Sequence, residues 1–217
     1  MWDVIWPAVW DTLYMVTLSA VITLFLGILL GIGLSVISKD GVRPVPVLNE
    51  SASTVVNCLR SLPQMIMIIV TLPIARMLLG QSYGVNACII ALAASCIPMY
   101  ARLVQGAFVE IPKGKIEAAK AMGSSSASIV FRIMLPEAIP SIIRGFTVAL
   151  IGIISMTALA GNFGAGGIGD IAVRFGFNRF YHDMLIASVL VLIVMVEIAQ
   201  ITGDIFSKII LKKRHLI

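Results

Sequence analysis

The sequence predicts an all-α polytopic membrane protein whose residues 1–217 form a single domain. Only 12% of the residues are charged and 59% are hydrophobic, whereas soluble domains carry about 25% charged residues. The mean hydropathy is +1.02. Three uncharged runs of 25 or more residues occur along the chain, and about 20 apolar residues are enough for a helix to cross a bilayer. We therefore expect five transmembrane helices.

The first two spans lie in the N-terminal part of the chain. A run of 27 uncharged residues predicts a span over residues 12–37. The second span, over residues 55–76, is less apolar, because only 15 uncharged residues separate Arg60 from Arg76. It still crosses the membrane if the two arginines extend to opposite interfaces. We expect Pro63 in its first turn, where the missing N–H costs little.

The other three spans follow from the remaining apolar runs. We expect them over residues 84–102, 141–160 and 184–206. Glu197 interrupts the last of them. Two longer connections remain, residues 103–140 and residues 161–183.

The basic residues predict which side of the membrane each connection faces. Five spans place the two termini on opposite sides. With the N-terminus outside, 13 of the 16 Lys and Arg residues lie in cytoplasmic segments, and only Arg76, Arg174 and Arg179 lie outside. Cytoplasmic loops are enriched in Lys and Arg. We therefore expect an external N-terminus, a cytoplasmic C-terminus, a cytoplasmic loop over 103–140 and an external loop over 161–183.

The cytoplasmic loop predicts a pair of short helices. "KIEAAKAM" is a helical segment with Gly123 as its C-terminal stop, and Ser124 or Ser125 can cap a second helix. Ala118, Ala119 and Met122 are expected on one face, where the two alanines would let a partner approach closely. From the residues alone, an amphipathic helix resting on lipid headgroups remains an equal alternative.

The same loop contains a longer pattern, E-A-A, three residues, G, nine residues, I-x-L-P. It is formed by Glu117, Ala118, Ala119, Gly123, Ile133, Leu135 and Pro136. This pattern resembles the signature of permease subunits of ATP-binding-cassette importers. The resemblance implies a type I importer transmembrane domain, in which the loop is a coupling helix that sits in a cleft of the ATPase subunit.

Further segments resemble the permease subunit of the methionine importer family. They are "NCLRSLPQMI" (57–66), "LPIARMLLG" (72–80), "IPKGKIEAAKAMG" (111–123), "LPEAIP" (135–140) and "GAGGIGD" (164–170). The resemblance implies import of D- or L-methionine across a bacterial inner membrane, by a homodimer with two cytoplasmic ATPase subunits and an external methionine-binding lipoprotein. A permease for another small amino acid or solute of the same class stays open.

ATP chemistry is expected to belong to the partner. The sequence contains no G-x-x-x-x-G-K-[ST] stretch for phosphate binding. The resemblance implies that the partner ATPase binds ATP and Mg²⁺ and that this chain binds no cofactor. We expect no catalytic residue, no metal site and no nucleic-acid partner; His182 and His215 lie on opposite sides of the predicted membrane.

Candidate functional residues fall into three groups. For coupling to the ATPase we expect Ile116, Glu117, Ala118, Ala119, Met122 and Gly123. For the pathway or gate in the fourth span the candidates are Ser155, Met156 and Leu159, although close helix packing is the better explanation for these residues. No charged or strongly polar cluster marks a site for an amino-acid carboxylate within the membrane.

An ion-coupled secondary transporter is the alternative from another class. Such proteins usually place ionisable residues in mid-membrane, and only Glu197, 14 residues after Asp183, is expected away from the ends of a predicted span. For this residue we favour a buried, protonated or hydrogen-bonded carboxyl at a helix interface. The five spans also show no inverted-repeat organisation of the kind that many secondary transporters have.

The external loop contains a G-x-G-x-x-G pattern at Gly164, Gly166 and Gly169. As a dinucleotide fingerprint the pattern requires a preceding strand within a βαβ unit, and here it follows a predicted span. We expect these glycines, with Gly167, to form a tight external loop at the mouth where the binding protein docks.

Overall fold

The computed structural model describes residues 2–213, and that part of the chain is 86% helical without a strand. The all-α expectation is confirmed. Arg214 and His215 lie outside the described residues. The helices and helical turns are α1 (Trp2–Ile37), α2 (Pro46–Ser61), α3 (Gln64–Leu79), α4 (Val85–Val109), α5 (Lys113–Ala121), α6 (Ser126–Ser128), η1 (Ile129–Met134), α7 (Leu135–Ala160), η2 (Gly161–Phe163), α8 (Gly167–Ile171), η3 (Ala172–Phe177) and α9 (His182–Lys213).

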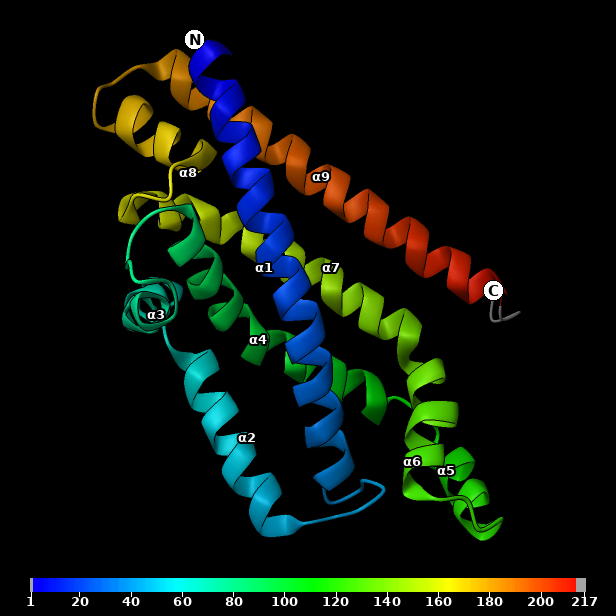
Figure 1. The fold of residues 1–217 in the computed structure, drawn as a ribbon. Coiled ribbons are helices and arrows are strands. Elements are labelled where there is room, and N and C mark those ends of the chain that lie inside the picture. The colour runs from blue at the N-terminus through cyan, green and yellow to red at the C-terminus, as the bar shows by residue number, and fades with distance from the viewer. Residues whose placement is uncertain (1, 214–217) are drawn as a thin grey trace.

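Among the described residues, four helical segments are long and apolar enough to cross a membrane: α1, α4, the continuous run from Ser126 to Phe163 that includes α7, and α9. They cross one another in a bundle, with the N-terminus and α8 at one end and α5 and α6 at the other (Figure 1). Segments predicted on opposite sides of the membrane therefore lie at opposite ends of the molecule.

The second predicted span differs from the expectation of one helix over residues 55–76. It consists of α2 and α3, which meet at an angle of 111°, and α3 is seen end-on in Figure 1. The break falls at Leu62, whose backbone is extended (φ −69°, ψ 137°). Pro63 causes it, because its ring disfavours helical geometry in the residue before it. Pro63 is thus the N-cap residue of α3 rather than part of a helix's first turn.

Two glycines allow α1 to approach α4 closely. A Cβ at Gly31 would lie 2.6 Å from the Val104 Cβ and 2.7 Å from the Ala101 carbonyl oxygen. One turn earlier, Gly27 faces the ring of Tyr100. Small residues four apart are a common device for close packing of membrane helices. Tyr100 is fully buried. Its ring and that of Phe146 pack edge to face, with 5.6 Å between the ring centroids.

The glycine-rich segment after α7 is packed into the bundle, and it is not the open loop that its composition suggests. The backbone N–H of Ile168 donates a 2.9 Å hydrogen bond to Thr12 Oγ1 on α1. Gly167 and Gly169 are buried, and a Cβ at Gly169 would collide with the Ala158 backbone of α7. The glycines therefore permit close approach between α8, α1 and α7.

Candidate functional site

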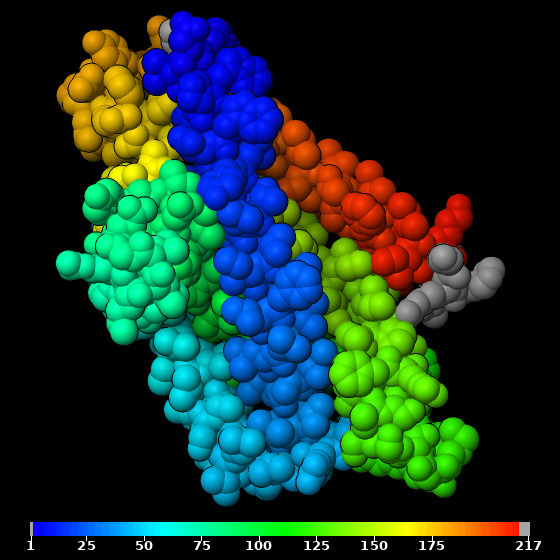
Figure 2. Space-filling view, viewed as in Figure 1, coloured from blue at the N-terminus to red at the C-terminus, as the bar shows by residue number. Residues whose placement is uncertain are grey.

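The short helix α5 projects from one corner of the molecule (Figure 2). Its C-terminal end is closed by Gly123, which adopts the left-handed conformation (φ +76°). The N–H of Gly123 donates to the Lys120 carbonyl at 2.9 Å, and the N–H of Ser124 donates to the Ala119 carbonyl at 3.1 Å. This pair of bonds is a Schellman motif, for which glycine is the favoured residue. The predicted glycine stop is confirmed.

A second helical segment begins directly after this turn. The side chain of Ser125 accepts a 3.2 Å hydrogen bond from the Ser128 N–H, so Ser125 is the N-cap, as expected. The segment is not a separate helix, because it continues through η1 into α7. Pro136 lies in the first turn of α7 and cannot donate to the carbonyl of Arg132; the wider turns of η1 accommodate this missing bond.

The two faces of α5 are clearly different. Ala119 is only 1% exposed and belongs to a buried cluster with Ile129, Val130 and Met134. Ile116 packs against the same cluster. The expectation that Ala119 lies on the docking face is therefore wrong, because this side of α5 is its attachment to the rest of the chain.

The opposite side of α5 is open to a partner. Glu117 and Ala118 are exposed, and Met122 is 77% exposed. A methionine side chain is flexible and apolar, and at an exposed helix end it suits contact with a partner protein. Of the six residues expected for coupling, Glu117, Ala118, Met122 and Gly123 form the outward surface.

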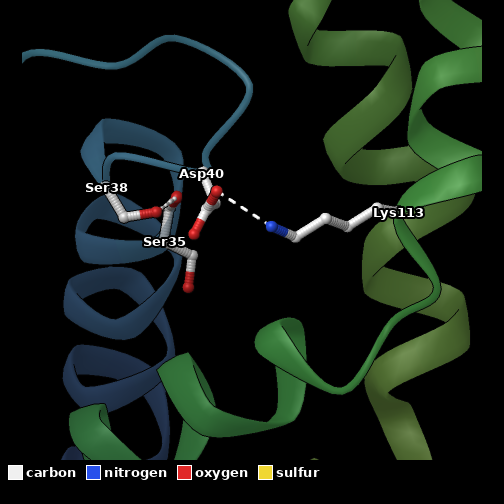
Figure 3. A network of polar contacts seen from close by, with 4 residues as sticks. All are labelled: Ser35, Ser38, Asp40 and Lys113. Carbon is white, nitrogen blue, oxygen red and sulfur yellow. Dashed lines mark hydrogen bonds and ion pairs between the residues drawn. The ribbon is translucent and has the colours of Figure 1, made fainter.

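Two ion pairs tie α5 to different parts of the bundle. Lys113 Nζ lies 2.9 Å from Asp40 Oδ1, in the connection that follows α1, and Figure 3 shows this pair next to Ser35 and Ser38 at the end of α1. Lys115 Nζ lies 2.6 Å from Glu137 Oε1 at the start of α7. Exposed ion pairs stabilise little. They connect α5 to the segment after α1 and to the start of α7.

The residues expected for a gate do not lie on one surface. Ser155 is exposed, and its hydroxyl donates to the Ile151 carbonyl at 3.0 Å. Met156 is 1% exposed and belongs to the central buried cluster, and Leu159 packs against that cluster. Met156 therefore packs within the chain, and Ser155 is the one of the three that faces outward.

A groove of about 670 Å³ opens between α1, α7 and α9. Its lining is apolar apart from a few hydroxyl groups, such as those of Thr17 and Thr147. It offers no charged group to the ammonium or carboxylate of an amino acid. Among residues 2–213, no group of three or more His, Cys, Asp or Glu side chains could hold a metal ion.

Arg102 joins α4 to α2. Its Nη2 donates a 2.9 Å hydrogen bond to the Ser53 carbonyl on α2, and its Nη1 donates to the side-chain oxygen of Gln105 on α4. We expected Arg102 at the end of a span, and nothing in the local sequence pattern indicates its hydrogen bond to α2.

Glu197 lies on an exposed face of α9. Asp204 is exposed two turns later on the same helix, and the side-chain amide of Gln200 lies 3.4 Å from both of its carboxyl oxygens. The expectation of a buried carboxyl does not fit the exposure of Glu197 in the single chain.

Similar proteins are known by sequence. Residues 23–215 match the family described as binding-protein-dependent transport system inner membrane component. The chain is 38% identical over 202 residues to a probable D-methionine transport system permease protein MetI of Vibrio cholerae, covering 93% of this chain and 90% of that one. It is 39% identical over 176 residues to the methionine import system permease protein MetP of Bacillus subtilis, covering 81% and 79%.

Solved structures share the fold. An inward-facing MetNI methionine ABC transporter matches with a TM-score of 0.91 and 32% identity, covering 94% of each chain. An amino acid ABC transporter crystallised with histidines matches with a TM-score of 0.76 at 18% identity, a likeness of fold alone.

Proposed function

The chain belongs to the family of binding-protein-dependent transport system inner membrane components, and we propose that it forms the translocation pathway for methionine in an ATP-driven importer. It is a transporter permease subunit and not an enzyme. The observation that carries this proposal is the agreement along nearly the whole chain with a methionine ABC transporter, at a TM-score of 0.91. The relatives from Vibrio and Bacillus are both described as methionine permeases.

The permease acts with partner chains. Two copies enclose the pathway, because five spans are too few to surround a gated route. Two cytoplasmic ATPase subunits bind ATP and Mg²⁺, and each contacts the outward surface of one α5. An external methionine-binding lipoprotein delivers the substrate at the end of the molecule that carries α8. This arrangement rests on the family membership and on the exposure of Glu117, Ala118 and Met122.

Orientation follows from the distribution of charge. The basic residues of α5 and of the C-terminal segment lie on the cytoplasmic side, and the N-terminus lies outside the inner membrane. The α5 end of the molecule then faces the ATPase, and the α8 end faces the binding protein. Figure 1 supports this assignment, since α5 and α8 lie at opposite ends.

ATP-driven movement passes from α5 to the spans through its attachments. Closure of the two ATPase subunits moves the outward surface of α5. The buried contact of Ala119 and the ion pair between Lys115 and Glu137 carry this movement to α7. The ion pair between Lys113 and Asp40 carries it to the end of α1. The spans thereby alternate between inward- and outward-facing arrangements.

Uptake by proteoliposomes tests the proposed function. The permease is reconstituted with its partner ATPase, the binding protein is added outside, and accumulation of radiolabelled methionine is measured. We expect uptake that requires ATP inside the vesicles and is unchanged by ionophores that collapse ion gradients. Accumulation by this chain alone, without ATP and abolished by ionophores, would instead identify an ion-coupled transporter.

A further inference from the structure

We propose that a polar cavity at the α5 end of the bundle binds the headgroup of a membrane lipid that carries both a phosphate and a primary ammonium group. The cavity has a volume of about 280 Å³, close to the lower end of the range of about 300–1,000 Å³ for small-molecule sites. We call it the headgroup cavity. The inference goes beyond the proposed function, because it does not depend on which substrate the permease carries.

The headgroup cavity has a polar wall and an apolar floor. The polar wall comes from the end of α1, the connection after it and the first turn of α2, and consists of Ser35, Ser38, Lys39, Asp40 and Asn49. The floor includes Phe108 on α4 and Met134 in η1, which are both buried. Figure 3 shows Lys113, at the start of α5, reaching towards Asp40, with Ser35 and Ser38 on the α1 side.

The connection after α1 fixes the polar wall in place. The Gly41 N–H donates to the Ser38 carbonyl at 2.9 Å, and the Arg43 N–H donates to the Val36 carbonyl at 3.1 Å. A Cβ at Gly41 would lie 2.4 Å from the Ser35 carbonyl oxygen, so the chain turns back tightly against the end of α1. The cavity is therefore formed without a ligand.

The polar wall presents hydrogen-bond acceptors. Asn49 Oδ1 is buried and has no hydrogen-bond partner within residues 2–213, which is unusual and costly for a buried polar atom. The Ser35 hydroxyl donates to the Gly31 carbonyl at 2.9 Å, and the Ser38 hydroxyl donates to the Ser35 carbonyl at 2.8 Å. Each hydroxyl has thereby used its one proton, and its oxygen remains an acceptor. A ligand with several N–H donors would satisfy this wall.

The rim of the headgroup cavity is charged. Lys113 Nζ lies 2.9 Å from Asp40 Oδ1, and both side chains are mostly exposed. Lys39 lines the same rim and forms no ion pair with another described residue. Because Asp40 and Lys113 neutralise each other, Lys39 leaves one uncompensated positive charge at the rim. This charge favours an anionic group next to the wall of acceptors.

A phosphate joined to a primary ammonium matches both features. A primary ammonium has three N–H donors and no acceptor, so it can pair with the oxygens of Asn49 and the two serines. The neighbouring carboxylate of Asp40 favours its positive charge. The phosphate can accept from Lys39 and from the remaining N–H groups of Lys113. A quaternary ammonium has no N–H and would leave the buried acceptors unpaired.

The position of the cavity favours a lipid over a free molecule. The cavity lies at the C-terminal end of α1, a helix long and apolar enough to cross the membrane, and so at the level of the membrane surface. Val109 in its wall is exposed, and so are Val47 and Leu48, which precede Asn49 on α2. Exposed apolar side chains beside a polar cavity suit the acyl chains of the same lipid. Basic pockets between membrane helices bind lipid headgroups in other proteins.

A lipid in this cavity leaves the outward surface of α5 free for the ATPase. Lys113 and Ile116 line the cavity from α5, whereas Glu117 and Met122 on the outward surface do not. The headgroup therefore adds a contact between α5 and the ends of α1 and α2. Both ligands, the lipid and the ATPase, can be bound at the same time.

Lipid binding to the complete complex of permease and ATPase in detergent provides the test. The complex is titrated with short-chain dioctanoyl phosphatidylethanolamine, phosphatidylcholine or phosphatidylglycerol, and bound lipid is counted by native mass spectrometry. Free phosphoethanolamine and free methionine are added as competitors, because both carry an ammonium and an anionic group without acyl chains. The variants are Asn49→Leu, Asn49→Asp and Lys39→Gln. Asn57→Leu, at an exposed position two turns later on α2, is the matched control.

We expect phosphatidylethanolamine to bind about tenfold more tightly than phosphatidylcholine, in line with a hydrogen bond to a charged group. Asn49→Leu should remove this preference, whereas Asn49→Asp, which keeps the acceptor, should retain it. Lys39→Gln should weaken the binding of all three lipids about threefold, as for an exposed charge. Asn57→Leu should bind like the unmodified protein.

Several outcomes would overturn the inference. Equal binding of phosphatidylethanolamine and phosphatidylcholine would show that the acceptors are not used. An unchanged preference in Asn49→Leu would place the lipid elsewhere. Tighter binding of phosphatidylglycerol than of phosphatidylethanolamine would assign the cavity to an anionic headgroup. Displacement of the lipid by equimolar phosphoethanolamine or methionine would assign it to a free zwitterion.

Discussion

Thr12 and Ile168 are joined by a hydrogen bond across 156 residues of sequence, in which the Ile168 N–H donates to Thr12 Oγ1 at 2.9 Å. The same hydroxyl donates to the Ala8 carbonyl at 2.9 Å, so the buried Thr12 oxygen is satisfied as both donor and acceptor. One side chain on α1 thereby holds the N-terminal end of α8. The glycine-rich segment is in this way fixed to the bundle at the end opposite α5.

Thr12→Val should destabilise the protein, because it leaves the buried N–H of Ile168 without an acceptor. Leaving a buried polar group unsatisfied costs about 1–3 kcal/mol. The measurement is the midpoint of thermal unfolding of the purified permease in detergent. Thr12→Ser keeps the hydroxyl and is the control, with a midpoint closer to that of the unmodified protein. Equal midpoints for the valine and serine variants would contradict the role of this hydrogen bond.

Gly169→Ala should also destabilise the fold, by about 1–3 kcal/mol for a forced overpacking of helices. The added methyl group would collide with the backbone of Ala158. Gly152→Ala is the matched control on α7, since its methyl group would meet only the Met99 side chain at an ordinary 3.7 Å. Folded yield and unfolding midpoint check both variants. A stable Gly169→Ala protein would show that α8 is more loosely packed than the structure indicates.

Met122→Asp should uncouple the permease from its ATPase without harming the fold. Met122 is 77% exposed, so the change removes an apolar contact with the ATPase and places a charge in the proposed interface. We expect affinity for the ATPase to fall about tenfold or more, as at the centre of protein interfaces. Binding of the purified ATPase to permease in nanodiscs measures this. An unchanged affinity would remove Met122 from the interface.

Ala119→Asp should behave differently, although Ala119 belongs to the same sequence pattern. Its side chain is 1% exposed among Ile129, Val130 and Met134, and an unpaired buried charge is strongly destabilising. We expect loss of folded protein from the membrane rather than uncoupling. Size-exclusion profiles of the solubilised variant check this. A well-folded Ala119→Asp protein with normal ATPase binding would show that α5 detaches from the bundle at little cost.

The sequence predicted the local features of the coupling loop well, because they depend on neighbouring residues. Gly123 ends α5 and Ser125 caps the next helical turn through backbone geometry that each residue type favours. Helical periodicity does not determine which face of α5 is buried, however. Ala119 packs inward because η1 folds back against this helix. The break at Leu62 was not predicted, because the span over residues 55–76 was assigned from its uncharged length. The restriction that Pro63 places on the backbone of the preceding residue was given too little weight.

Contacts between distant segments lay beyond sequence reasoning. The hydrogen bond from Arg102 to the Ser53 carbonyl forms only because α2 packs beside α4, and Arg102 alone was explained as a residue at the end of a span. The G-x-G-x-x-G pattern at Gly164, Gly166 and Gly169 was separated from a nucleotide-binding fingerprint by its context, because it follows the helix α7 and not a strand. The packing of Gly167 against Thr12 and of Gly169 against Ala158 depends on how three helices are arranged, and no local sequence pattern contains this information.

The burial of Gly167 also changes how contact with the binding protein should be probed. A cysteine at Gly167 would lie against Thr12 and be inaccessible, whereas Asn162 and Gly164 are exposed in the same segment. We expect Asn162→Cys to crosslink to the binding protein during turnover and Gly167→Cys to remain unmodified. Labelling with a membrane-impermeant maleimide provides the accessibility control. If neither Asn162→Cys nor Gly164→Cys crosslinked to the binding protein, the docking surface would lie elsewhere.

The most direct test of the central claim, that a separate cytoplasmic ATPase subunit drives this permease through α5, is site-specific crosslinking at that helix. The exposed Cys58 is first replaced by Ser, while Cys88 and Cys96 are buried and can remain. Met122→Cys and Ala119→Cys are then treated with a short bifunctional reagent in vesicles that carry the partner ATPase. The account predicts an adduct between permease and ATPase at position 122, with a yield that changes when ATP is added, and none at position 119. No adduct at position 122 in a complex that still imports methionine would contradict it.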